Sequence, residues 1–177
     1  TVQKFQPDMM LNDMKMSKST GNFMTLFQCL EKFGTDASRF ALADSGDTLD
    51  DANFKSEVAN SAILKLFVLE QWIQNNVPAG EADFSSTELT LWDQILLNEV
   101  NKALITCKAA YEEMKFKTVI KAFNELLNIK ESYIIAQKGQ KNPRIILAYV
   151  EALLTIMNPV TPHFCQYVWK NHVFARL

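Results

Sequence analysis

The chain is poor in cysteine, proline, glycine and histidine, and it has no long hydrophobic run. Among its 177 residues are three Cys, five Pro, five Gly and two His. The three cysteines, Cys29, Cys107 and Cys165, are far apart and show no CxxC spacing, so we expect reduced structural thiols and no metal site. The longest apolar stretch, 61–69, is interrupted by Lys65 and is far shorter than the ~20 residues that a membrane helix needs.

The remaining composition is that of an ordinary soluble domain. The first eight residues, TVQKFQPD, contain no apolar segment, so the sequence predicts no cleavable signal peptide. A chain of this length can bury a sizeable core, since about 68–70% of the unfolded surface is buried at ~150 residues. We therefore expect a cytoplasmic protein that neither enters a membrane nor binds DNA.

The most informative positive feature is the run KMSKSTGN at positions 15–22. Two lysines stand three residues apart among hydroxyl side chains, and Gly21 gives the turn conformational freedom. A triphosphate that loses pyrophosphate spreads negative charge over several oxygens, and ammonium, hydroxyl and backbone N–H groups stabilise such charge. The run therefore predicts a loop that binds a polyphosphate.

This run and its flanks resemble a known family, the class I aminoacyl-tRNA synthetases, in which KMSKS is one of two ATP-binding motifs. The flanks resemble the leucine-tRNA ligases, and most closely their cytosolic eukaryotic branch. The matching stretches are MLN at 10–12, GNFMT at 21–25, GTDASR at 34–39, ADSGDTLDDANF at 43–54 and NPVTPHF at 158–164, with Trp169 beyond them.

The resemblance implies roles for five loop residues. Lys15 and Lys18 would stabilise the triphosphate and the departing pyrophosphate, and they are the candidate catalytic residues. Ser17 and Ser19 would support the loop, and the backbone of Met16 would lie near the adenine. The implied substrates of the whole enzyme are leucine, tRNA(Leu) and ATP with magnesium, and no tightly bound cofactor is implied.

The other ATP motif of the class, HIGH, is absent. The only histidines are His163 and His172, and neither lies in such a motif. We therefore expect a fragment that begins just before KMSKS and is inactive alone. Valine and isoleucine enzymes have similar helical domains. The identification of leucine as the amino-acid substrate therefore rests only on the flanks of the loop.

Helical signals dominate the rest of the chain and predict an all-α fold, an antiparallel helical bundle. Expected capping boxes are Thr25 with Gln28 and Ser85 with Glu88, and Asp50 or Asp51 should cap a long helix that includes Phe54 and ends before Pro78. Further helices are expected at 85–114, 117–137, 143–157 and from 162 past 169. The predicted units are the end of a catalytic domain with the loop (1–24), a helical connector (25–53) and an anticodon-binding bundle (54–177).

Charge is segregated along the chain. Residues 36–99 contain three basic and twelve acidic residues, for −9, whereas 115–144 contain seven basic and two acidic ones, for +5. Lysines of this kind contact RNA phosphates, or they simply solvate a helix exterior. The resemblance to an anticodon-binding domain favours RNA, and a protein-docking module is the alternative. The candidate RNA-binding residues are Lys117, Lys121, Lys138, Lys141 and Arg144.

Two further groups have structural explanations. The acidic run Asp44, Asp47, Asp50 and Asp51 lacks the alternating ligand spacing of a calcium loop, and helix capping explains it better. His163 should lie in the first turn of a helix, where we expect a neutral, hydrogen-bonded imidazole rather than a catalytic base.

Overall fold

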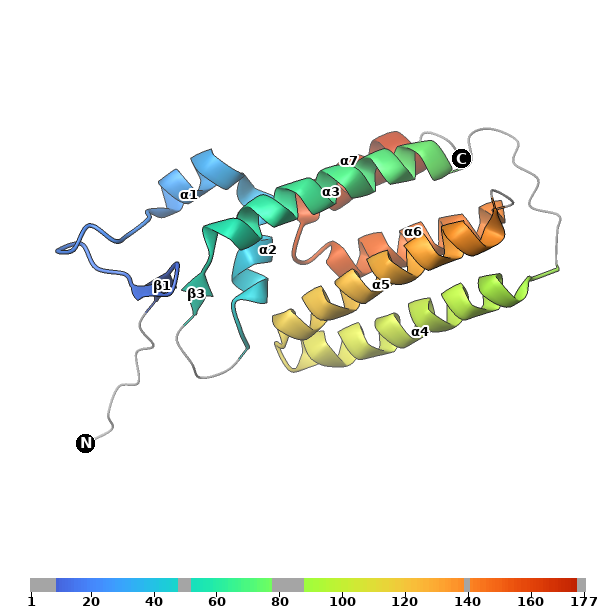
Figure 1. Cartoon of the computed structure of the whole chain (residues 1–177), viewed down its shortest axis with the longest axis horizontal. Coiled ribbons are helices and arrows are strands. Elements are labelled where there is room, and N and C mark those ends of the chain that lie inside the picture. Colours follow the sequence, from blue (N-terminus) through green and yellow to red (C-terminus); the bar gives the residue numbers. More distant parts are fainter. Residues whose placement is uncertain (1–8, 48–51, 78–87, 139–140, 175–177) are drawn as a thin grey trace.

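Long helices that run antiparallel to one another make up most of the structure (Figure 1). The computed structural model describes residues 9–47, 52–77, 88–138 and 141–174. Within these ranges the helices are α1 (Leu26–Phe33), α2 (Thr35–Asp44), α3 (Ser56–Asn76), α4 (Leu91–Glu112), α5 (Phe116–Gln137), α6 (Pro143–Met157) and α7 (Pro162–Val168), which continues as a π-helical turn (Trp169–Val173). The strands are β1 (Met10–Leu11), β2 (Met14–Lys15) and β3 (Asn53–Phe54).

The bundle is formed by α3, α4, α5 and α6, with α7 lying against α3 (Figure 1). Apolar side chains at three- and four-residue spacing face inward, which is the pattern that buries one stripe of each helix. The largest fully buried side chains include Leu69, Ile73, Leu96, Phe123, Tyr149 and Leu153. The predicted all-α antiparallel bundle is confirmed. No described helix combines the length and the apolar character needed to cross a bilayer.

A small sheet at one end of the bundle was not predicted. Its strand order is β2-β1-β3, with β1 antiparallel to β2 and parallel to β3. Each strand has two residues, which is too short for an alternating pattern to be recognised in sequence. Phe54, expected on a helix, lies in β3, where its ring packs 5.7 Å from that of Phe33.

Several predicted helix starts are confirmed and others are wrong. Thr25 and Gln28 form the predicted capping box of α1, and Asn142 caps α6 with Pro143 as its first residue. The next capping box is formed by Thr90 and Asp93 instead of Ser85 and Glu88, so α4 begins at Leu91. Asp93 was not recognised because a short Asp at the third helical position is a less usual partner than Glu.

The cap predicted for the long helix is also wrong. This helix, α3, begins at Ser56 after Lys55, whose side chain makes no capping hydrogen bond. Asp50, Asp51 and Ser85 lie outside the described residues.

The two short helices α1 and α2 connect the sheet to the bundle. Arg39 on α2 donates to the backbone carbonyls of Val160 (Nε, 2.9 Å) and Pro159 (Nη2, 2.6 Å). The ring of Phe40 lies edge-on to that of Phe123 on α5, with centroids 5.9 Å apart. The connector is thus fastened to the bundle by both polar and apolar contacts.

Candidate phosphate-binding loop and nucleic-acid interface

The KMSKS run forms the tip of a hairpin that extends away from the bundle (Figure 1). Ser17 pairs with Asn22 in an antiparallel bridge, and the Ser17 N–H donates to the Asn22 carbonyl at 2.9 Å. The four residues between them form the turn, which is closed by Gly21 N–H donating to the Lys18 carbonyl at 3.3 Å. Gly21 has a φ of 73°, which a residue with a Cβ rarely adopts. Lys18, at the start of the turn, is exposed.

Hydroxyl and amide side chains hold the loop together. The Ser17 and Ser19 hydroxyls are 2.8 Å apart, and the Thr20 hydroxyl donates to the Ser17 carbonyl at 3.2 Å. The side-chain amide of Asn22 donates to the carbonyls of Met14 (3.2 Å) and Lys15 (3.1 Å). These bonds shape a backbone that has little buried surface of its own.

The five predicted loop residues lie together but differ in how far their side chains are exposed to solvent. Lys15, at the end of β2, is exposed like Lys18 and Ser19, whereas Ser17 is half-buried. Met16 is half-buried against the core and lines an apolar cavity of about 160 Å³ with Met24 and Phe54. The Met16 side chain thus anchors the loop, and both lysines stay on its accessible side.

The candidate RNA-binding residues do not form one cluster. Lys117 and Lys121 lie at the start of α5, whereas Lys138, Lys141 and Arg144 surround the turn from α5 to α6. At 1.5 Å rise per residue, Lys117 and Lys138 are about 32 Å apart along α5. The structure therefore offers two basic ends, one on the side of the loop and one at the far end of the bundle (Figure 1).

The two ends differ in how their charges are engaged. Lys121 is 4.0 Å from Glu125, with both side chains largely exposed, so this pair contributes little. Lys141 donates to the side-chain carbonyl of Asn76 at the end of α3 and is half-buried. Lys138 and Arg144 are exposed. Lys141 therefore also has a structural contact.

A further lysine of the basic segment, Lys130, is buried. Its side chain is 5% exposed, its Nζ lies 2.6 Å from Glu131, and it stands 4.8 Å from the centroid of the Trp72 ring. This charge belongs to the interior of the bundle and is not available to RNA.

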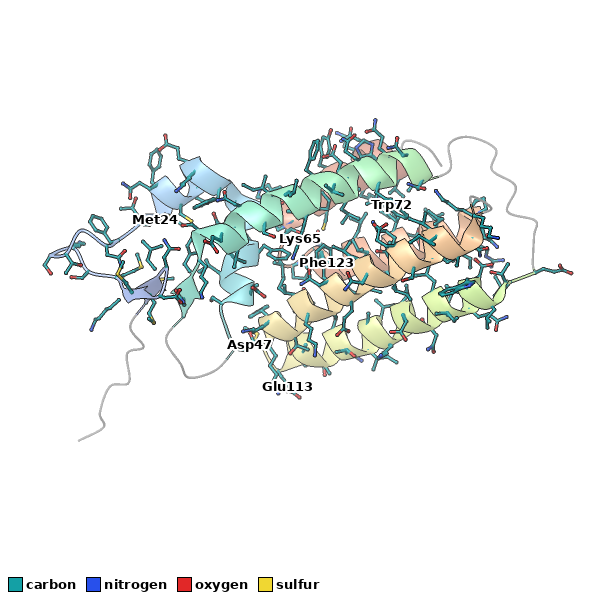
Figure 2. The ribbon with its side chains drawn as sticks, viewed as in Figure 1. Met24, Asp47, Lys65, Trp72, Glu113 and Phe123 are labelled. Atoms are coloured by element: carbon teal, nitrogen blue, oxygen red, sulfur yellow. The ribbon has the colours of Figure 1, made fainter. Side chains whose placement is uncertain are left out.

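One residue of the acidic run, Asp47, caps a helix, whereas the predicted caps Asp50 and Asp51 lie outside the described residues. Both carboxylate oxygens of Asp47 accept from the Lys117 backbone N–H, at 2.8 and 3.0 Å, beside the start of α5 (Figure 2). A carboxylate there satisfies an orphan N–H and complements the positive end of the helix dipole. In the described ranges no group of three or more His, Cys, Asp or Glu side chains could hold a metal ion.

His163 is hydrogen-bonded, in line with the expectation. Its Nδ1 lies 3.0 Å from Asp36 Oδ1, and the other oxygen of that carboxylate accepts from the Phe164 N–H at 2.6 Å. Asp36 thereby caps α7, and the imidazole is held in the same contact.

All three cysteines are free thiols. Burial raises the pKa of Cys107 and of Cys165 to about 11, which makes both thiols poor nucleophiles at neutral pH.

Sequence reasoning missed the turn that precedes the loop. Asn12 and Asp13 join β1 to β2, and both have positive φ. A two-residue Asn-Asp turn after apolar residues is a recognisable hairpin signal. The strands on either side have two residues each, which is too short to show an alternating pattern.

Two family descriptions match the chain, one toward each end. The first, "tRNA synthetases class I (M)", covers residues 5–66, which include the loop. The second, "Anticodon-binding domain of tRNA ligase", covers residues 93–176, which include α5 and α6. The loop and the bundle thus each match a part of the same class of enzyme.

Solved structures show the same fold. The ternary complex of Agrobacterium radiobacter K84 agnB2 LeuRS with tRNA and LeuAMS superposes with a TM-score of 0.69 at 18% identity, covering 96% of this chain and 23% of that chain. Mycobacterium tuberculosis methionyl-tRNA synthetase in complex with methionyl-adenylate gives 0.70 at 18% identity, covering 94% of this chain and 39% of that chain. At such identity the likeness concerns the fold.

The hairpin loop and the bundle are thus similar to two parts of the class I tRNA synthetases. Among curated proteins, the chain matches cytoplasmic leucine–tRNA ligases. It is 35% identical to that of Pongo abelii over 170 residues, and 37% identical to that of Saccharomyces cerevisiae over 164 residues. These alignments cover 96% and 92% of the chain but only 14% and 15% of the two relatives, so it corresponds to one segment of them.

Proposed function

We propose that the chain provides the ATP-binding loop and the tRNA-binding helical domain of a cytoplasmic leucine–tRNA ligase. In the whole enzyme, leucine and ATP give leucyl-adenylate and pyrophosphate, and leucine then passes to the 3′ end of tRNA(Leu). The observation that carries this proposal is the hairpin at 17–22, which exposes Lys18 at its tip. The names of the curated relatives support the choice of leucine.

In this proposal the two lysines act when pyrophosphate departs. Negative charge grows on the leaving oxygens, and the exposed ammonium groups of Lys15 and Lys18 stabilise it more strongly at the transition state than in bound ATP. The hydroxyls of Ser17 and Ser19 keep the turn in shape, and the Met16 backbone lies near the adenine. In the whole enzyme, magnesium would enter with ATP as part of the substrate.

Replacement of Lys18 in the intact ligase tests this proposal. Lys18→Ala should lower the kcat of leucine-dependent ATP–pyrophosphate exchange by about a hundredfold, as loss of one donor to a developing oxyanion does. Leucine binding, measured by calorimetry, should be unchanged. Lys102→Ala is a matched control, because Lys102 is an exposed lysine on α4, paired with Glu99. Normal exchange in Lys18→Ala would refute the assignment.

We further propose that the two basic ends contact the phosphates of tRNA(Leu). The five candidate residues are Lys117, Lys121, Lys138, Lys141 and Arg144, of which Lys141 also binds Asn76. Phosphate contacts lose affinity as salt rises, because bound counterions are released on binding. The proposed tRNA contact therefore predicts a salt-dependent affinity.

Exposed apolar side chains favour a second candidate, a protein-docking module. Leu26 and Phe27 on α1 are 72% and 71% exposed, and Leu64 and Phe67 on α3 are 63% and 57% exposed. Large apolar groups on a protein surface can mark contact sites. Binding of a protein through these groups would be insensitive to salt, which separates it from the tRNA contact.

A further inference from the structure

The turn that leads into the loop has a constrained backbone. Asn12 and Asp13 have φ values of 50° and 67°, the left-handed pair found in tight two-residue hairpins. The turn joins β1 to β2, and β2 ends at Lys15. The conformation of two residues thus sets the direction in which the chain enters the KMSKS loop.

Asn12 caps α3 from 44 positions away. Its Oδ1 accepts a hydrogen bond from the Ser56 N–H at 3.0 Å, and its own N–H donates to the Phe54 carbonyl at 3.0 Å. Lys55, directly before the helix, makes no side-chain cap. The first-turn N–H groups of a helix need an acceptor, and Asn is among the best residues for this purpose. Asn12 therefore supplies a cap that the sequence around Ser56 lacks.

Asp13 strengthens the same junction. It exchanges two hydrogen bonds with the Asn53 side chain, at 3.1 and 2.7 Å, and its carboxylate lies 2.9 Å from Lys55 Nζ. Lys55 donates a hydrogen bond to the Asp13 carboxylate. This bond lowers the pKa of Asp13 and raises the pKa of Lys55. Because these groups are exposed, they contribute orientation more than stability.

The loop is attached to this same hairpin on its other side. Met16 N–H donates to the Met9 carbonyl at 2.8 Å, and Asn22 holds the carbonyls of Met14 and Lys15. A rotation of the hairpin about the start of α3 would consequently move Lys15 and Lys18 together.

We propose that Asn12 is a positioning residue for the adenylation step, an inference that rests on the proposed function. By capping α3 it holds the hairpin, and with it Lys15 and Lys18, at a fixed angle to the bundle. Asn12 does not touch ATP and acts through the strand that leads to the loop. Since a displacement of about 1 Å at a reacting group costs up to ~10²-fold in rate, loss of this cap should lower kcat.

Two substitutions at position 12 separate the cap from the backbone conformation. Asn12→Gly adopts positive φ readily but has no acceptor, whereas Asn12→Asp keeps an acceptor that caps helices well. In the intact ligase, Asn12→Gly should lower the kcat of leucine-dependent ATP–pyrophosphate exchange about tenfold, with KM for leucine changed by less than about twofold. Asn12→Asp should stay within about twofold of the unaltered enzyme.

Substitution of the donor gives a second route to the same test. Ser56→Pro removes the N–H that donates to Asn12 Oδ1, and Pro is well tolerated as the first residue of a helix. This variant should lower kcat as Asn12→Gly does. It also keeps the test open if Asn12→Gly fails to fold, which melting curves would show.

The control removes a cap that is remote from the loop. Thr90→Ala breaks the local cap of α4 and should leave exchange unchanged although stability falls. A normal kcat in Asn12→Gly or Ser56→Pro, a kcat in Asn12→Asp as low as in Asn12→Gly, or an equal loss in Thr90→Ala would overturn the positioning role. Normal exchange in Lys18→Ala would instead refute the proposed function itself.

Discussion

In the N-terminal region (residues 9–47 and 52–54) the side-chain cap of α1 is local, whereas the bundle (α3 to α7) is capped partly by its own residues and partly by those of the N-terminal region. Helices α1, α4 and α6 are capped by the residue directly before them, namely Thr25, Thr90 and Asn142. Helices α3, α5 and α7 instead receive a cap from the N-terminal region, through Asn12, Asp47 and Asp36. The comparison shows that polar groups of one region complete the helices of the other.

The apolar contacts are divided unequally between the same two regions. The bundle supplies most of the buried apolar side chains, although both regions also expose large apolar groups, such as Phe27 on α1 and Ile105 on α4. The buried residues of the N-terminal region, among them Phe40 and Ala41 on α2, belong to the same core cluster as those of the bundle. The N-terminal region thus shares its core with the bundle, and three helices of the bundle receive caps from the N-terminal region.

The largest expected effect on stability comes from removing the apolar contact between α2 and α5. Phe123→Ala removes a fully buried ring that lies edge-on to Phe40 and should lower the free energy of unfolding by about 3–5 kcal/mol. Urea unfolding of the 177-residue chain would measure this. Phe123→Leu, which keeps most of the volume, should cost less, and equal losses in the two variants would argue against a packing effect.

A smaller effect on stability is expected from removing one of the remote helix caps. Asp47→Ala removes the acceptor for the Lys117 N–H and should cost about 0.5–2 kcal/mol, the usual range for a helix cap. Hydrogen exchange should show faster opening at the start of α5 and unchanged protection in α4. Asp47→Asn retains an acceptor and is the matched control. If the alanine variant were as stable as the asparagine variant, the cap would contribute nothing.

Substitutions at the two basic ends should have the smallest effects on stability. They should nevertheless have a clear effect on tRNA binding. Lys117→Gln with Lys121→Gln, and separately Lys138→Gln with Arg144→Gln, should each lower the salt dependence of tRNA(Leu) binding by about one per lost phosphate contact. Affinity at several salt concentrations would be measured on the intact ligase, with Lys102→Gln as control. An unchanged slope in both double variants would favour the docking candidate.

The features that were predictable from sequence are those set by nearby residues. Helix ranges, the local caps at Thr25 and Asn142 and the compact KMSKS turn follow from spacing and side-chain chemistry within a few positions. The two-residue strands and the remote caps depend instead on contacts between segments about 40 to 130 positions apart, such as Asn12 with Ser56 and Asp36 with Phe164. No local pattern encodes such contacts, which is why Asp50 and Asp51 were chosen as caps.

The candidate site shows the same division. The loop residues were identified together because the motif is contiguous, and their roles and that of the basic residues stay predictions. The separation of Lys117 from Lys138 follows from the helix predicted at 117–137, which the structure confirms as α5 (Phe116–Gln137). Burial of Lys130, in contrast, was not predictable, since a lysine on a helix is usually solvated.

Helix α3 begins at the cap from Asn12 and ends at Asn76, which binds Lys141 at the far end of the bundle. Its 21 residues make a rigid arm about 32 Å long. One continuous helix therefore spans the whole distance between the hairpin that carries the loop and the turn beside Lys141.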